Sequence, residues 1–287
     1  MLSKILFATA ILFILYLFLI CPRFRRRDKS FYSPDEPFAH RGLYGNGVPE
    51  NSLVAFRAAV DAGFGIELDV QMTVDGVLVV FHDYDLERLT GKAGKLNQMR
   101  FSELRELCLE GTEEKIPSLD EVLTLVDGKV PLLVELKGEN FKVAPLCSAV
   151  AERLDSYRGD YCIESFNPLQ LRWFKKNRPG VVRGQLVTNA VKDYPQGNFL
   201  LRFLLSHLLL DAFSRPDFVA FNGMYRWEVS LLLCRKLFRA RACVWTVRDE
   251  DKYRFALSCG VYPIFEHFCP EDTENVCEAQ RKEEKTA

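Results

Sequence analysis

Two acidic residues stand two positions apart in the otherwise apolar segment GFGIELDV, residues 63–70. Side chains at positions i and i+2 of a β-strand point the same way, so Glu67 and Asp69 share one face of the strand predicted here. Aliphatic residues occupy the opposite face. An unpaired buried carboxylate costs several kcal/mol, so this pair requires a cation, a proton or hydrogen-bonding partners.

The segment PLLVELK at 131–137 repeats this pattern, with Glu135 and Lys137 on one predicted face. Three carboxylates at strand ends form an oxygen-rich site typical of Ca²⁺ or Mg²⁺ rather than of softer metals. The alternative is an internal salt-bridge network between these carboxylates and Lys137. The recurrence on two strands favours a single divalent cation.

Two of the four histidines follow strand-like apolar runs: His40 after PFA and His82 after VLVVF. Each is followed directly by a charged residue, Arg41 or Asp83. Either histidine alone would be interpreted as structural, but the pair suggests a general base and a general acid. His207 and His267 lack this context, and we interpret both as structural.

Arg41 beside His40 and Lys137 beside Glu135 add two cations to the same predicted site. A planar guanidinium and an ammonium together match a phosphate better than a neutral substrate. Two imidazoles, a divalent cation and two fixed positive charges therefore indicate phosphodiester cleavage.

Short apolar segments alternate with helical patterns from residue 38 onward, which predicts parallel strands joined by helical crossovers. The predicted strands are 38–40, 65–70, 77–81, 131–136, 161–165, 182–187, 217–221, 242–246 and 261–265. The predicted helices lie near 51–62, 101–107, 118–126, 142–155, 168–177, 227–239 and 249–258. Ser118, three residues before Glu121, predicts a capping box. Eight such units favour a TIM-type (β/α)₈ barrel over 38–270, and no GxGxxG follows the first strand.

An N-terminal transmembrane helix is predicted within residues 1–21, because residues 5–21 carry no charge. Seventeen helical residues span roughly 25 Å, which is short but sufficient for a bilayer core. A cleaved signal peptide is the alternative, but FLICPRF lacks a small-residue cleavage site. A basic linker follows at 22–37, and its arginines place the barrel in the cytoplasm by the positive-inside rule. We therefore expect a single-pass membrane protein.

The apolar segment 199–213 has two interpretations: a buried helix, or a helix in the membrane interface that adds to the lipid contact of 5–21. Residues 271–287 form a polar tail. The nine cysteines include no CxxC pair, which favours buried free thiols in a reducing compartment. The net charge of −1 argues against a nucleic-acid partner.

These segments together resemble the glycerophosphodiester phosphodiesterases. The resemblance covers 38–270 and rests on HRG at 40–42, PENSLVAF at 49–56, IELDVQMTVDGVLVVFHD at 66–83, IPSLDEVL at 116–123, VELK at 134–137 and VWTVRDEDK at 244–252, with a weaker echo in SFNPLQLRWF at 165–174. It implies a metal-dependent enzyme that converts a glycerophosphodiester to glycerol 3-phosphate and an alcohol.

Carried over residue by residue, the resemblance makes His40 and His82 the acid–base pair. It makes Glu67, Asp69 and Glu135 the metal ligands, and Arg41 and Lys137 the phosphate contacts. Glu50 and Asn51 support the site in this comparison, although Asn51 also suits a helix N-cap, and Trp245 lines the substrate pocket. The last strand departs from the family pattern: YPIFEHFCP at 262–270 offers Glu266 in place of the usual acid.

Two rival functions remain at this level. One is lysophospholipase D activity on lysophospholipids at the membrane, which the apolar helix and 199–213 favour. The other is a catalytically silent membrane scaffold, which the presence of every implied catalytic residue disfavours.

Overall fold

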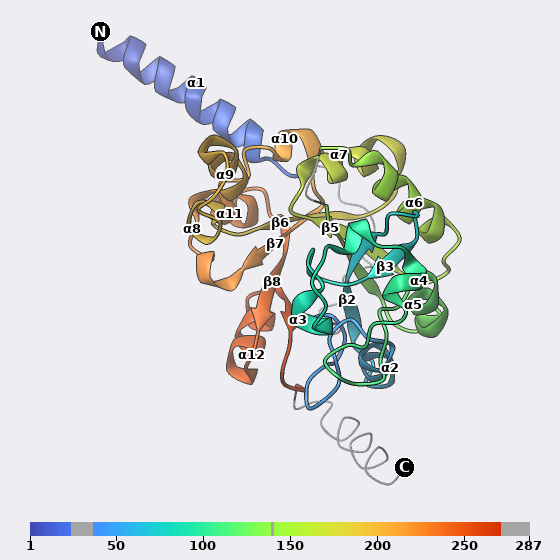
Figure 1. Ribbon diagram of the computed structural model, residues 1–287. Helices are drawn as coiled ribbons and strands as arrows, with labels where there is room; N and C mark the ends of the chain where they lie inside the picture. The colour runs from blue at the N-terminus through green and yellow to red at the C-terminus, as the bar shows by residue number, and fades with distance from the viewer. Residues whose placement is uncertain (24–36, 139–140, 271–287) are drawn as a thin grey trace. The chain divides into compact units, whose positions relative to one another are not determined.

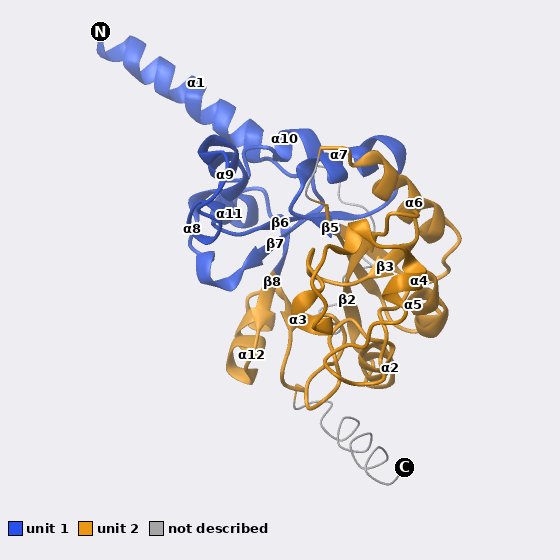
Figure 2. Cartoon of the chain, in the orientation of Figure 1, with its two compact units in different colours: residues 1–27, 164–243 blue, residues 28–163, 244–287 orange. Residues whose placement is uncertain are grey.

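The computed structural model describes residues 1–23, 37–138 and 141–270 (Figure 1). The predicted tail 271–287 lies outside the described residues, as does the predicted linker except for Pro22, Arg23 and Pro37. The chain forms two compact units, coloured separately in Figure 2. Unit 1 comprises residues 1–27 and 164–243, and unit 2 comprises 28–163 and 244–287. The boundaries fall inside two strands, so the expected barrel segment 38–270 contributes to both units.

Unit 2 contains the first four strands, the last strand and the helices between them. Its elements are β1 (Phe38–Ala39), α2 (Leu53–Asp61), β2 (Gly65–Met72), β3 (Leu78–Val80), α3 (Glu87–Thr90), the 3₁₀ turn η1 (Leu96–Gln98), α4 (Phe101–Leu104), α5 (Leu119–Val126), β4 (Leu132–Leu136), α6 (Ala144–Asp155), α12 (Glu250–Ser258) and β9 (Tyr262–Phe265). Strands β5 (Tyr161–Ser165) and β8 (Arg241–Val247) cross the unit boundaries.

Unit 1 contains the N-terminal helix and the strands that follow β5. Its elements are α1 (Leu2–Ile20), α7 (Pro168–Asn177), β6 (Arg183–Val187), α8 (Ala190–Asp193), α9 (Phe199–Ser206), α10 (Asp211–Ser214), β7 (Phe218–Asn222), the 3₁₀ turn η2 (Gly223–Tyr225) and α11 (Val229–Lys236). Every predicted strand, and every predicted helix outside 199–213, is confirmed to within three residues at each end.

The nine strands form one sheet in the order β1-β9-β8-β7-β6-β5-β4-β2-β3. Strand β1 pairs in parallel with both β2 and β9, which closes the sheet into a barrel. Strand β3 instead pairs antiparallel with β2 as a hairpin at the edge of this order. The predicted TIM-type fold with an N-terminal apolar helix is confirmed.

Strand β2 is buried along Gly65–Gln71, as expected for a barrel strand with apolar residues on one face and functional residues on the other. It pairs in parallel with β4, and Asp69 stands opposite Glu135 in the register. Residues opposite each other on neighbouring strands point to the same face, so the two acidic patterns meet.

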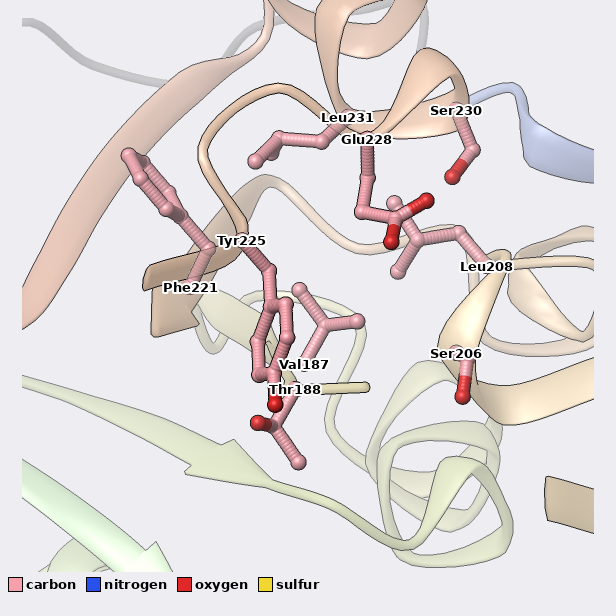
Figure 3. A pocket seen from close by; sticks show the side chains of 9 residues that line it. All are labelled: Val187, Thr188, Ser206, Leu208, Phe221, Tyr225, Glu228, Ser230 and Leu231. Atoms are coloured by element: carbon pink, nitrogen blue, oxygen red, sulfur yellow. The ribbon is translucent and has the colours of Figure 1, made fainter. Parts of the chain in front are cut away.

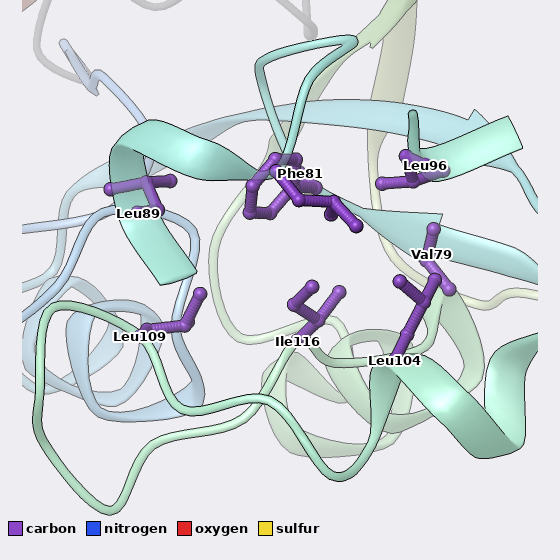
Figure 4. Close-up of a cluster of buried hydrophobic side chains, with 8 residues drawn as sticks. Val79, Phe81, Leu89, Leu96, Leu104, Leu109 and Ile116 are labelled. Carbon is purple, nitrogen blue, oxygen red and sulfur yellow. The ribbon is translucent and has the colours of Figure 1, made fainter. Parts of the chain in front are cut away.

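A small hydrophobic cluster of unit 2 holds the segment after β3 in place (Figure 4). Val79 and Phe81 are fully buried in it, against residues from the loop and the helices that follow. The remaining buried members are Leu86, Leu89, Leu96, Leu104, Leu109 and Ile116. Because His82 follows Phe81 directly, this packing fixes the backbone from which the His82 side chain projects.

Residues 199–213 form two short helices, α9 and α10, rather than one. The interpretation as a buried helix is wrong for α9, because Phe199, Leu200, Leu201 and Phe203 are exposed and only Ser206 is buried within it. The helix ends where Leu208 takes a positive φ of 56° and buries its side chain.

Cysteine environments differ partly from the expectation of buried thiols. Among the described residues, the free and buried cysteines are 21, 147, 162, 234 and 243. Cys108 and Cys259 are free but exposed, and Cys269 is disulfide-bonded.

Candidate active site

Three buried carboxylates of unit 2 lie together on the neighbouring strands β2 and β4. Each of Glu67, Asp69 and Glu135 offers one oxygen to a group whose members all lie within 4.8 Å of one another. All three side chains are buried. The sequence pattern placed them on common faces, and the β2–β4 register brings them to one place.

The cluster carries more negative charge than its ammonium partner neutralises. Lys137 Nζ lies 3.3 Å from Asp69 Oδ1 and 3.1 Å from Glu135 Oε1. Asp69 Oδ1 accepts no hydrogen bond from the described residues. Burial raises the pKa of Glu135 and the Asp69 charge adds to the rise, although Lys137 opposes it. These carboxylates therefore fit a hard divalent cation, which would supply the missing positive charge.

His40 begins the loop after β1 and is held by the last strand. Its backbone N–H donates to Phe265 O at 2.8 Å, and its Nδ1 lies 2.5 Å from Glu266 Oε2. Its Nε2 lies 3.9 Å from Glu67 Oε2, which places the imidazole beside the carboxylate cluster. Burial lowers the pKa of His40, and the Glu266 hydrogen bond opposes this shift.

Glu266 is fixed by two further donors in addition to His40. Tyr44 Oη donates to its Oε2 at 2.7 Å, and Arg248 Nε donates to its Oε1 at 2.7 Å. Burial alone would raise the pKa of Glu266, but these contacts hold it well below its usual range. The residue offered by the divergent last strand is thus the direct partner of His40.

His82 is held by its neighbour and by an amide beneath its loop. Its Nδ1 lies 2.6 Å from Asp83 Oδ1. Gln71 Nε2 donates to the carbonyl oxygens of Phe81, His82 and Asp83 at 2.8, 3.3 and 2.7 Å. Gln71 lies on β2 two residues after Asp69, so one strand positions both a carboxylate of the cluster and the His82 loop.

Arg88 links the His82 side of the site to Glu50. Its Nε donates to Asp83 Oδ2 at 2.5 Å, and its two terminal nitrogens donate to the Glu50 oxygens at 2.7 and 3.0 Å. Arg41 Nη1 also donates to Glu50, at 2.7 Å. Burial would raise the pKa of Glu50, but the two guanidinium groups hold it below its usual range. Glu50 therefore joins two arginines rather than facing water.

Arg41 adopts a left-handed backbone with φ of 56°. A left-handed arginine costs about 1 kcal/mol or more. This conformation lets its backbone N–H donate to Glu67 Oε2 at 3.0 Å, while its Nε lies 3.5 Å from Asp69 Oδ2. The residue thus touches the cluster through both its backbone and its side chain.

Asn51 is not a helix N-cap, because Ser52 caps α2 by accepting from Ala55 N–H at 3.2 Å. Its Nδ2 instead donates to Asp69 Oδ2 at 2.9 Å. Trp245 lies on β8 and is partly exposed, so its pocket-lining role stays a prediction.

The other two histidines also have acidic neighbours. His207 Nδ1 lies 3.8 Å from Glu228 Oε2 in unit 1. His267 Nε2 lies 3.6 Å from Glu266 Oε1, and its ring packs edge-on against Tyr44. His267 therefore borders the site, although its context in the sequence suggested only a structural role.

The sequence patterns did not identify four residues that support the site: Tyr44, Gln71, Arg88 and Arg248. Each is a common surface or strand residue in its local segment, so no local pattern marks it. Asp83 could have been found, because a carboxylate directly after a predicted catalytic histidine can hold its ring.

A separate pocket occurs within unit 1 (Figure 3). Residues of β6, α9 and α11 line it, among them Val187, Ser206 and Leu231. Its one charged lining side chain, Glu228, accepts a hydrogen bond from Asn189 Nδ2 at 3.1 Å. None of the predicted site residues lines this pocket.

Comparison with known proteins agrees with this geometry. Residues 40–270 match the glycerophosphoryl diester phosphodiesterase family. A glycerophosphodiester phosphodiesterase of Bacillus altitudinis is 33% identical over 165 residues, which cover 54% of this chain and 67% of that protein. One from Caldanaerobacter subterraneus is 35% identical over 158 residues, which cover 52% of this chain and 65% of that protein. The matches span about two thirds of these relatives.

A solved structure of an Oleispira antarctica phosphodiesterase in complex with sn-glycerol-3-phosphate superposes with a TM-score of 0.68. The two chains are 24% identical, and the match covers 85% of this chain and 96% of the other. This likeness shows the shared fold.

Proposed function

The chain belongs to the glycerophosphoryl diester phosphodiesterase family, a family of phosphoric diester hydrolases, and on this premise we propose that it hydrolyses glycerophosphodiesters. Water adds across the ester: its hydroxyl joins phosphorus, the bond to the alcohol oxygen breaks, and a proton goes to that oxygen. The products are glycerol 3-phosphate and an alcohol.

The observation that carries the proposal is the buried three-carboxylate cluster with His40 and Arg41 against it. Arg41 and Lys137 would bind the phosphate in this proposal, and their contacts with Asp69 in the cluster support that role. A divalent cation held by Glu67, Asp69 and Glu135 would stabilise negative charge on those oxygens.

His40 and His82 transfer the protons in this proposal. Each presents Nδ1 to a carboxylate, Glu266 or Asp83, which leaves Nε2 as the nitrogen for the substrate. One imidazole removes a proton from the attacking water, and the other protonates the departing alkoxide. Trp245 is proposed to line the pocket for the substrate.

Lysophospholipids are a second candidate substrate class, favoured by the apolar helix α1. It is 19 residues long, and Ile20 is its only buried residue. We propose that α1 anchors the enzyme in a membrane with the barrel on the cytoplasmic side. A substrate that retains one acyl chain would then lie in the same membrane.

Product analysis with purified full-length enzyme tests the function. We expect glycerol 3-phosphate from glycerophosphocholine, loss of turnover with EDTA, and recovery with Ca²⁺ or Mg²⁺. Glu67→Gln should reduce kcat by at least about 10²-fold, because charge stabilisation at a phosphoryl group is a large catalytic contribution.

Glu250→Gln on α12 is the matched control, because Glu250 pairs with Arg254 and belongs to no part of the site. Its activity should equal that of the wild type. Turnover of lysophosphatidylcholine but not of glycerophosphocholine would contradict the proposal that the enzyme acts on water-soluble glycerophosphodiesters. Turnover that EDTA leaves unchanged would contradict the metal site.

A further inference from the structure

The C-terminal end of α1 is built into unit 1. Ile20 and Cys21 are buried. The last carbonyls of a helix have no partners within the helix. Here Arg215, at the end of α10, donates to Phe18 O at 3.0 Å and to Cys21 O at 2.7 Å, and its guanidinium lies 4.5 Å from the centre of the Phe18 ring. Cys234 Sγ on α11 donates to Ile20 O at 3.2 Å.

The chain stays attached to unit 1 beyond the helix. Arg23 N–H donates to Pro216 O at 2.9 Å, and Arg23 Nη1 lies 3.4 Å from Asp217 Oδ1. The first two residues of the predicted linker are therefore docked. These contacts hold the C-terminal end of α1 against the rest of unit 1 on both sides of Cys21.

Helix α9 exposes an apolar face close to this junction in the chain. The exposed fractions of Phe199, Leu200 and Phe203 are 61%, 62% and 40%. The one charged side chain of the helix, Arg202, turns away to donate to Tyr194 O at 2.7 Å. Four residues separate α9 from α10, the helix that carries the Arg215 cap and contacts α1. Helix α10 lies at the C-terminal end of α1 (Figure 1).

We infer that α9 lies in the interface of the bilayer that α1 enters, so that unit 1 contacts the membrane by two elements in a fixed relation. The inference rests on the proposed membrane anchoring by α1. Exposure of an apolar face to water is unfavourable roughly in proportion to the exposed area. A lipid interface is the partner favoured for this face. Helix α10, four residues after α9, contacts α1 near the point where an inserted α1 leaves the membrane.

Photo-cross-linking of the full chain in phosphatidylcholine–phosphatidylglycerol nanodiscs tests this inference. One photoreactive p-benzoylphenylalanine replaces Phe13 on α1, Phe203 on α9 or Phe255 on α12, in three separate variants. All three phenylalanines are exposed, and Phe255, at 63%, is more exposed than Phe203. We expect lipid adducts from positions 13 and 203, with several-fold less from position 255.

Adducts from position 13 without adducts from position 203 would overturn the α9 contact while the anchor stands. A cross-link from position 203 to a second copy of the chain would also overturn it. Absence of adducts at position 13 would overturn both membrane contacts. None of these results bears on hydrolysis of glycerophosphocholine, which is measured separately in solution.

The role of the Arg215 contacts in holding α1 is tested by Arg215→Gln, made in the variants with the probe at position 203 or at position 13. Loss of the cap should reduce the position-203 adduct several-fold while the position-13 adduct is retained. Arg254→Gln on α12, which removes an arginine from a surface pair, is the control and should change neither yield. Equal position-203 adduct yields in Arg215→Gln and Arg254→Gln would contradict a role for Arg215 in fixing α1 relative to α9.

Discussion

Both histidines of the site are held in the same manner, although they lie on different segments. Each imidazole contacts a carboxylate, and an arginine holds that carboxylate in turn. The two series are His40–Glu266–Arg248 and His82–Asp83–Arg88. Such partners fix the tautomer and orientation of a ring, which the proposed proton transfers require.

Replacing Glu266 by Gln should therefore affect catalysis more than binding. The amide keeps the shape of the side chain but removes the charge that orients His40. We expect kcat to fall by up to about 10²-fold, the lower end of what acid–base catalysis contributes, with little change in KM. Steady-state kinetics on glycerophosphocholine measures this. An unchanged kcat, equal to that of Glu250→Gln, would show that Glu266 does not position His40.

Asp83 gives a prediction for stability against pH. Burial would raise the pKa of Asp83, but the His82 and Arg88 contacts lower it below the usual 3.8. A carboxylate with a lowered pKa stabilises the folded state above its unfolded pKa, and this contribution is lost as the pH falls below it. Asp83→Asn should thus cost about 1 kcal/mol at pH 7. The difference in unfolding free energy between the wild type and Asp83→Asn, called the gap below, should narrow below about pH 4.

Urea unfolding at pH 7 and pH 3 measures this gap. Asp120→Asn is the control, because Asp120 pairs with Arg153 on an exposed surface. Such a pair contributes little at either pH. A gap for Asp83→Asn that stays constant with pH would contradict its depressed pKa.

At the scale of elements, one glycine of the HRG segment packs closely against helix α2. Gly42 has a φ of 83°, and a Cβ atom there would lie 2.8 Å from the carbonyl carbon of Ala55. Gly76 has nearly the same φ, 84°, but a Cβ atom there would meet nothing within 4 Å. The two positions therefore separate backbone strain from steric conflict.

Gly76→Ala should cost about 1 kcal/mol of unfolding free energy, the cost of a left-handed alanine. Gly42→Ala should cost more, because α2 or the Arg41 backbone must also move, and it should reduce activity. Urea unfolding and turnover of both variants measure this. Equal losses of stability would contradict close packing of Gly42 against α2.

The strand patterns predicted the faces of the site because alternation is a local property. Glu67 and Asp69, or Glu135 and Lys137, share a face whatever the rest of the chain does. The residues that hold the histidines were not predictable in this way, since Arg88 meets Glu50 across 38 positions. Asn51 shows the same limit, because a local cap pattern could not reveal its contact with Asp69. The break between α9 and α10 depends on tertiary packing of Leu208.

At the scale of the molecule, all the predicted site residues belong to unit 2, whereas α1 and α9 belong to unit 1. The proposed catalysis and the proposed membrane contact can therefore be perturbed separately by substitution. A variant in α9 that alters lipid contact should leave the carboxylate cluster intact.

The proposed topology is tested by a reporter fused after Ala287 in the full chain. Positive charges that follow α1 should keep the barrel in the cytoplasm. A reporter active only in the cytoplasm should therefore give a signal, and one active only outside should not. The opposite result, a signal only from the reporter that is active outside, would show that the barrel lies outside the cytoplasm. Substituting Arg25 and Arg26 by Gln, in the segment after α1, should weaken the bias.

The pairing of His40 with Glu266 also orders events during synthesis on the ribosome. These two residues are 226 positions apart, so the first histidine of the site is translated long before its carboxylate partner. Under the proposed anchoring, a nascent chain meets the membrane through α1 before His40 of the proposed acid–base pair has its Glu266 partner. On these proposals, hydrolysis begins only after the last strand is made, when insertion of α1 is already complete.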